Sequence, residues 1–353
     1  MNPLESILVT TDFSDAANQA LQRAALIATQ HQARLTLLHV VDPSALKGPR
    51  TWFSSAAGID HKVAVAQAAL GRLAARLAGR HDLHVTQVVQ VGRPLEHICR
   101  MTDEADLLVF GTKRVNPLRN LLLGTPTEQL LRLVRQPVLV AKRAAQDNYQ
   151  CVLVAVNLDA DPMAMLRSAG ALAPAASLHA LHALSTRRMD RMRASNVPER
   201  VIQEVGGSER LRGMAKLRAM LRSTGLGDAQ AAVDHGDPSR LTLDKQQQLS
   251  ADLIVLGKDG QSALCNFLLG SVAQRILASA PCDILIMPKV AALRGSVKLP
   301  ASGTWLDSSP ARVFDPVDAL APAVPKWAKA PAGLRASAQS KPETRTDADA
   351  QPA

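Results

Sequence analysis

Three glycines and a serine in the second half of the chain have a spacing that could hold a phosphate group. Two residues separate Gly257 from Gly260, and nine residues separate Gly260 from Gly270 and Ser271, giving the pattern G-x2-G-x9-G-S. A glycine at the end of a strand lets a ligand approach the backbone, and a second one can adopt the positive φ of a curled loop. A helix beginning near Gly270 would add free N–H groups and a positive dipole end, both of which favour phosphate.

The same residues also admit a purely structural interpretation. Ser271 with Gln274, and Thr125 with Glu128, have the spacing of capping boxes, so both hydroxyls could simply cap helices. Isolated glycines after strands are common turn residues. No Gly-Lys-Ser or Gly-Lys-Thr of a P-loop follows the spacer, and no G-x-G-x-x-G fingerprint opens the first helix of either half. The spacing alone therefore leaves both interpretations open.

The glycine pattern belongs to a sequence repeat. The segment 106–111 (DLLVFG) recurs at 252–257 (DLIVLG), and 121–125 (LLLGT) recurs at 267–271 (FLLGS), both at an offset of 257 − 111 = 146 positions. A fixed offset of this kind indicates two copies of one structural unit.

Each copy alternates short apolar runs with longer helical patterns. Strands are expected at residues 7–10, 35–41, 85–91, 107–110 and 138–141, and in the second copy at 152–156, 178–184, 231–235, 253–256 and 284–287. Helices of the first copy are expected at 16–30, 56–78, 94–102 and 126–133. Because several strands are continuously apolar, both faces of the sheet should be covered. The pattern predicts an α/β fold with two tandem, open, mostly parallel five-stranded sheets flanked by helices.

Composition sets the remaining limits. The 353 residues are 47% hydrophobic with a net charge of +10, which excludes wholesale disorder. No apolar run is long enough to cross a membrane and no secretory signal opens the chain, so a cytoplasmic protein without membrane contact is expected.

We predict domains at 1–145 and 149–290. Prolines spread through 291–353 without an apolar period, which predicts a mostly disordered tail.

The second glycine motif, followed by the apolar run 281–287, resembles the carboxyl-terminal half of a universal stress protein domain. Segments 7–12 (ILVTTD) and 37–42 (LLHVVD) resemble the first two strands of that family. The likeness spans roughly residues 1–290 as two domains in tandem and leaves the tail unmatched. It implies the adenine nucleotide alpha hydrolase-like fold, pairing of domains, and ATP binding in members that keep the glycine motif.

The resemblance assigns nucleotide contacts in both copies, with ATP as the expected cofactor, with or without Mg²⁺. In the second copy, which we prefer, they are Asn157, Leu256, Gly257, Lys258, Gly260, Gly270, Ser271 and Val272. In the first copy, as a weaker site, they are Asp12, Val41, Gly111, Gly124 and Thr125. The family's first strand ends with an Asp that hydrogen-bonds the nucleoside; this is Asp12 in the first copy, but Asn157 replaces it in the second.

The first copy departs from the motif where phosphate would bind. Arg114 replaces the second glycine, Pro126 removes one N–H from the helix start, and Glu128 adds negative charge nearby. The second copy keeps its glycines and has the neutral Gln274 in place of the acid. Lys258 could counter phosphate charge or be exposed without a role. We predict that the second domain binds ATP and that the first is mainly its packing partner.

Two functions remain open at this stage. One is a nucleotide-binding module with a regulatory or protective role in stress response. The other is a nucleotide-free adaptor that uses domain pairing and a basic helix or the tail to bind a partner or polyanion. Basic residues crowd positions 187–222, which fits either a solvated amphipathic helix or a polyanion surface. No nucleophile or metalloprotease motif occurs, so at most slow ATP hydrolysis is expected. Pairing within the chain and a homodimer are both compatible with the repeat.

Overall fold

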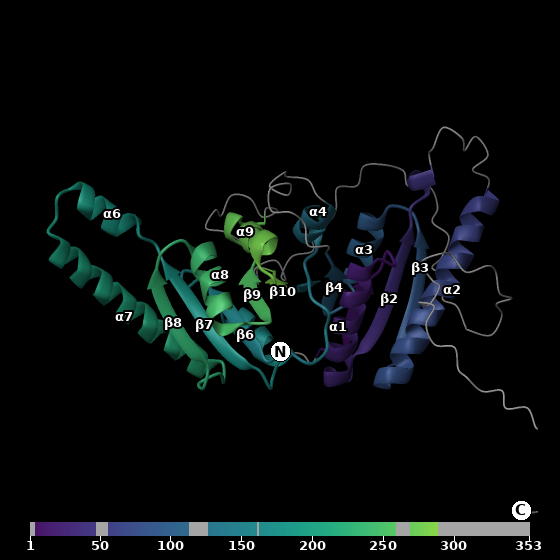
Figure 1. Ribbon diagram of the computed structural model, residues 1–353, viewed down its shortest axis with the longest axis horizontal. Helices are drawn as coiled ribbons and strands as arrows, with labels where there is room; N and C mark the ends of the chain where they lie inside the picture. The colour runs from purple at the N-terminus through teal and green to yellow at the C-terminus, as the bar shows by residue number, and fades with distance from the viewer. Residues whose placement is uncertain (1–3, 47–55, 113–125, 161, 259–268, 289–353) are drawn as a thin grey trace, which may run out of the picture. The chain divides into compact units, whose positions relative to one another are not determined.

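The computed structural model describes residues 4–46, 56–112, 126–160, 162–258 and 269–288 (Figure 1), which all belong to one compact unit. The described strands form one ten-stranded sheet in the order β3-β2-β1-β4-β5-β10-β9-β6-β7-β8. In the first repeat they are β1 (Ser6–Thr10), β2 (Arg34–Val41), β3 (Val85–Val91), β4 (Leu107–Gly111) and β5 (Val138–Ala141). In the second repeat they are β6 (Cys151–Val156), β7 (Ser177–Leu184), β8 (Gln230–His235), β9 (Leu253–Gly257) and β10 (Asp283–Met287). The predicted tail at 291–353 lies outside the described residues.

Among the described strands, one antiparallel pair joins the two repeats into the common sheet. All other strand pairs are parallel, but β10 runs antiparallel to β5, with Leu285 opposite Leu139. The expected α/β fold class, mostly parallel and flanked by helices, is confirmed, and the five strands of each repeat are joined through the β5–β10 pair into one sheet.

Helices cover both faces of the sheet. They are α1 (Asp15–His31), α2 (Ala56–His81), α3 (Pro94–Thr102), α4 (Pro126–Leu133), α5 (Met163–Leu172), α6 (Arg187–Ala194), α7 (Glu199–Ser223), α8 (Pro238–Leu249) and α9 (Ser271–Ser279), with a 3₁₀ turn η1 (Pro43–Leu46). Apolar residues of α1, α2, α5 and α7 build the core on one face, and those of α3, α4, α8 and α9 build it on the other. Among the described helices none has the length and apolar character of a bilayer span.

The basic region between β7 and β8 forms two helices, where the sequence predicts one long helical region. Asn196 has a left-handed φ of 54°, and Pro198 lies at the N-cap of α7. Asparagine tolerates the left-handed region better than most residues, and proline cannot continue a helix because it lacks an N–H. These two residues therefore separate α6 from α7.

A buried ionic cluster joins the two repeats beside the antiparallel strand pair. The Asp283 carboxylate, 1% exposed, accepts hydrogen bonds from Arg23 Nε (3.0 Å) and Tyr149 Oη (2.9 Å) through Oδ2. Its Oδ1 accepts the backbone N–H groups of Lys142 (2.8 Å) and Arg143 (3.2 Å). Arg23 comes from α1 and Asp283 from β10, so this cluster ties a helix of the first repeat and the inter-repeat linker to the last strand of the second.

Candidate functional site

The sheet reverses its strand order at two places, and these are where the predicted site residues lie. In each half the chain builds the sheet outward from its first strand, first to one side and then to the other. Thus β1 lies between β2 and β4, and β6 lies between β7 and β9. In open parallel sheets ligands bind beyond the carboxyl ends of the strands at such switch points. In the first repeat, Asp12 follows β1 and Gly111 is the last residue of β4. In the second repeat, Asn157 follows β6 and Gly257 is the last residue of β9. The topology thus brings the two ends of each predicted site to one edge.

In the second repeat, two residues of the glycine motif, Lys258 and Gly270, are hydrogen-bonded to each other. The Gly270 N–H donates to the Lys258 carbonyl (3.0 Å), and the Lys258 N–H donates to the carbonyl of Met287 on β10 (2.9 Å). Residues 259–268, including Gly260, lie outside the described residues. The bond between Lys258 and Gly270 holds the start of α9 beside the carboxyl end of β9, as a phosphate cradle requires.

The start of α9 carries no side-chain cap. Its N-cap is Gly270, with φ −58° and ψ 149° and no side-chain hydrogen bond, and Ser271 is already the first helical residue. The interpretation of Ser271 as the capping residue is therefore wrong, because the cap position is one residue earlier. By contrast, Ser14 caps α1 and Asp237 caps α8. Within the described part of the chain, the first-turn N–H groups of α9 stay without a side-chain acceptor.

The glycines that end β4 and β9 lie in different surroundings. A Cβ added to Gly111 would lie 1.9 Å from the carbonyl oxygen of Ala16 in α1. The glycine of the first repeat is thus required for packing, because helix backbone occupies the space in front of it. A Cβ added to Gly257 would meet no described atom within 4 Å, and Gly257 is exposed. Among the described residues, therefore, nothing occupies the space in front of Gly257 as the Ala16 carbonyl does in front of Gly111.

The acidic and amide residues after the first strands hold local turns. Asp12 Oδ1 accepts the Ser14 N–H (2.9 Å), and Asn157 Oδ1 accepts the Asp159 N–H (3.1 Å). Both side chains are exposed. Both residues thus lie just beyond the carboxyl ends of β1 and β6.

A histidine on the second strand of each repeat supports this edge. His39 Nδ1 donates to the Thr11 carbonyl (2.8 Å), and His182 Nδ1 donates to the Val156 carbonyl (2.9 Å). Burial lowers the pKa of His39, and the Thr11 carbonyl and the Asp12 carboxylate, which favour the charged form, offset only part of this effect. Each ring is thus hydrogen-bonded to the backbone at the carboxyl end of the first strand of its repeat.

Sequence reasoning missed Phe13, which lies next to Asp12. Its ring centroid is 4.4 Å from that of His39, and its φ of 62° is rare for an aromatic residue. The corresponding residue of the second repeat, Leu158, is 4% exposed. Its position directly after the predicted Asp was the available signal. The first repeat therefore has a half-buried aromatic residue packed against the core where the second has a buried leucine.

The side chain of Lys258 binds the end of a helix in the first repeat. Its ammonium donates to the carbonyls of Arg132 (2.6 Å) and Val134 (3.0 Å) at the end of α4 in the first repeat. Lys142 makes the reciprocal contact, donating to the Ala280 carbonyl (2.9 Å) after α9. A cation at a helix carboxyl terminus is favoured by the helix dipole. Each lysine thus binds the other repeat's helix end across the β5–β10 pair.

The remaining predicted residues are apolar or not described. Val41 and Leu256 are buried, so a ligand could reach them only through the backbone, and Val272 is half-buried against the core. Gly124 and Thr125 lie outside the described residues, as does Arg114.

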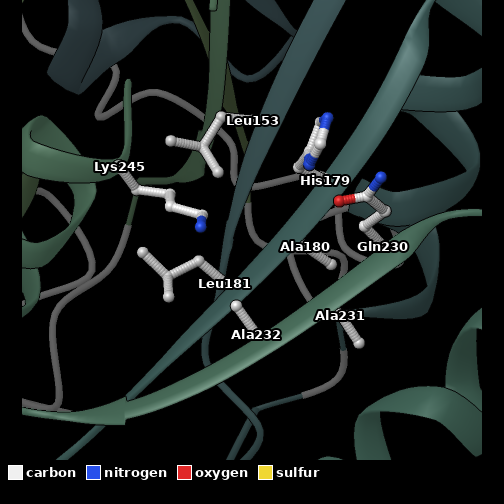
Figure 2. Close-up of a pocket in the computed structure, with 8 residues that line it drawn as sticks. All are labelled: Leu153, His179, Ala180, Leu181, Gln230, Ala231, Ala232 and Lys245. Atoms are coloured by element: carbon white, nitrogen blue, oxygen red, sulfur yellow. The ribbon is translucent and has the colours of Figure 1, made fainter. Parts of the chain in front are cut away.

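A small cavity lies at another place in the second repeat (Figure 2). It has a volume of about 60 Å³ and lies near the starts of β7 and β8, where Figure 2 shows His179, Gln230 and Lys245 around it. Ligand pockets usually enclose several hundred Å³, so this cavity has room for little more than water. It is not the predicted site, which lies beyond the carboxyl ends of the strands.

Comparisons with known proteins match both repeats. A model of the Universal stress protein family matches residues 3–142 and again 148–288. A universal stress protein of Mycolicibacterium smegmatis is 25% identical over 305 residues, covering 80% of this chain and 96% of the relative. One of Methanocaldococcus jannaschii is 28% identical over 155 residues, covering 39% of this chain and 95% of the relative.

A solved structure has the same arrangement. The crystal structure of a universal stress protein from Archaeoglobus fulgidus superposes with a TM-score of 0.62 at 17% identity, covering 80% of this chain and 96% of that one. At this identity the likeness concerns the fold alone.

Proposed function

The chain belongs to the universal stress protein family as two domains in tandem, and from this premise we propose that its second domain binds ATP or a related adenine nucleotide. The nucleotide lies beyond the carboxyl ends of β6 and β9, with its phosphates at the start of α9 and its nucleoside near Asn157. The binding serves a regulatory or protective role in stress response.

The observation that carries the proposal is the open strand end at Gly257 beside an uncapped helix start at Gly270. No described atom fills the space in front of Gly257, and the Gly270–Lys258 hydrogen bond holds α9 next to it. The first-turn N–H groups of a helix that lacks a side-chain cap are suited to bind phosphate oxygens. Backbone groups alone supply this cradle, so the engagement of Lys258 elsewhere does not weaken it.

The first domain is the weaker candidate for physical reasons. The Ala16 carbonyl occupies the space in front of Gly111, and Pro126, the first residue of α4, offers no N–H to a phosphate. Glu128 in the first turn of α4 adds negative charge. We therefore assign to the first domain the role of packing partner, through β5 and the Asp283 cluster. Homodimer formation stays a prediction.

Gly270→Asp is expected to abolish ATP binding without unfolding the protein. Any residue can adopt φ −58° and ψ 149°, and Asp is among the best N-cap residues, so we expect helix α9 to be as stable as before. The carboxylate would occupy the first-turn N–H groups and repel phosphate. We expect a loss of affinity of at least about tenfold, since a hydrogen bond to a charged group contributes roughly 1.5–3 kcal/mol. Isothermal titration of the full chain with ATP measures it.

Two variants control this experiment. Gly270→Asn has nearly the same shape without the charge and should weaken binding less, and Gly124→Asp, at the matching position of the first repeat, should leave binding intact. Nucleotide released by denaturing the purified wild-type protein would support the proposal independently. Absence of ATP binding in the wild type, or loss of binding with Gly124→Asp alone, would show the assignment to be wrong. A second candidate function, polyanion binding, rests on a separate observation described below.

A further inference from the structure

Helices α6 and α7 form a hairpin at the outer edge of the second repeat. Figure 1 shows α6 beside α7 and α7 beside β8. The buried face of α7 contains Ile202, Leu217 and Leu221, and Met189 of α6 packs against Gly206 of α7. The hairpin is therefore a fixed structural element whose other side faces solvent.

This hairpin carries most of the protein's excess positive charge. Residues 187–222 hold ten Arg and Lys residues and four Asp and Glu residues, a net charge of 10 − 4 = +6 against +10 for the whole chain. Three of the four carboxylates are already paired: Asp190 and Glu199 with Arg193, and Glu209 with Arg188.

Six exposed arginines of the hairpin have no carboxylate within ion-pair distance in the part of the chain that the structure describes. They are Arg187, Arg191, Arg200, Arg212, Arg218 and Arg222. The four on α7, here called the arginine stripe, lie on the side of the helix away from Ile202, Leu217 and Leu221. Charge of one sign, left unpaired on a rigid surface, attracts a partner of the opposite sign.

The length of the arginine stripe matches one turn of a nucleic-acid duplex. From Arg200 to Arg222 the helix rises by about 33 Å, at roughly 1.5 Å per residue. One turn of duplex DNA is about 34–36 Å long. Guanidinium groups bind phosphate oxygens in a bidentate manner, and such contacts carry no sequence information.

We propose that the α6–α7 hairpin binds the phosphate backbone of double-stranded nucleic acid without reading its sequence. A membrane surface is a poorer match, because helices that bind bilayers bury an apolar face in them, whereas the apolar residues Ile202, Leu217 and Leu221 of α7 are already buried within the protein. Of the described hairpin residues, the exposed large apolar side chains are Val201 and Leu211.

Fluorescence anisotropy with a labelled 20-base-pair duplex and the full chain tests this. We expect binding that weakens steeply between 50 and 200 mM salt, since each phosphate contact contributes about 0.9 to the slope of log K against log salt. Replacing the arginine stripe (Arg200→Gln, Arg212→Gln, Arg218→Gln and Arg222→Gln) should lower affinity at least tenfold at 50 mM salt and reduce the slope by about 3 to 4.

The matched control removes four exposed basic residues from α2, the corresponding helix of the first repeat. It combines Lys62→Gln, Arg72→Gln, Arg76→Gln and Arg80→Gln and has the same net charge, 10 − 4 = +6. Arg72 and Arg76 stand at the repeat offset from Arg218 and Arg222, 218 − 72 = 146. The control should bind within about threefold of wild type. Equal losses in both variants, no duplex binding at 50 mM salt, or tighter binding to anionic phosphatidylserine vesicles than to duplex would overturn the proposal.

Discussion

Replacing Asp283 by alanine is expected to lower the free energy of unfolding by about 3–5 kcal/mol, because it leaves a buried cation without its counter-charge. Arg23 is 6% exposed and lies 4.1 Å from the centre of the Tyr149 ring, with Nη1 donating to the Asp147 carbonyl (2.8 Å). Burial and the neighbouring carboxylate raise the pKa of Tyr149 well above its ordinary value, so its hydroxyl stays protonated and donates to Asp283. Without the carboxylate, the guanidinium loses its counter-charge, and the phenol and two backbone N–H groups lose their hydrogen-bond acceptor.

Urea denaturation followed by far-ultraviolet circular dichroism measures this loss. Asp252→Ala is the matched control: its carboxylate also accepts two backbone N–H groups, of Gln150 (2.8 Å) and Cys151 (3.1 Å), but it is only half-buried. We expect the control to lose about 1–2 kcal/mol. The double variant Arg23→Met with Asp283→Leu should recover only the part of the loss due to the unpaired guanidinium, because the Tyr149 hydroxyl and the two backbone N–H groups still lack their acceptor. A loss from Asp283→Ala no larger than that of the control would contradict the central role of the cluster.

Gly111→Ala is expected to destabilise the protein by about 3 kcal/mol, at the upper end of the cost of overpacking a core. The new methyl group would lie 1.9 Å from the Ala16 carbonyl oxygen, and this neighbour is helix backbone that cannot rotate away. The first turn of α1 would have to move from the sheet. The midpoint of thermal or urea unfolding reports the change.

Gly257→Ala provides the matched comparison at the same position of the second repeat. Its methyl group would meet no described atom within 4 Å, so stability should stay within about 0.5 kcal/mol of wild type. Equal destabilisation by the two substitutions would mean that the strand end at Gly257 is as filled as that at Gly111, and it would remove the main support for a ligand there.

The sequence alone determined the fold class and the repeat, and it predicts the edge of the sheet at which a ligand would bind. Continuous apolar runs such as 107–110 and 253–256 alternate with helical patterns, and this local periodicity is enough to predict a parallel sheet with covered faces. The carboxyl ends of neighbouring parallel strands meet at one edge of a sheet. Since Asn157 follows its strand and Gly257 ends its strand, the sequence already predicted that these two residues lie at the same edge. The glycine motif further indicated which copy is intact.

Only the tertiary structure decided what the individual residues contact. Gly111 and Gly257 occupy equivalent sequence positions, yet one faces the Ala16 carbonyl and the other faces no described atom. Lys258 follows the glycine-ending strand, yet it binds the end of α4 in the other repeat. The cluster around Asp283 joins residues up to 260 positions apart. Contacts of this kind depend on the docking of distant segments, and local sequence periodicity does not encode that docking.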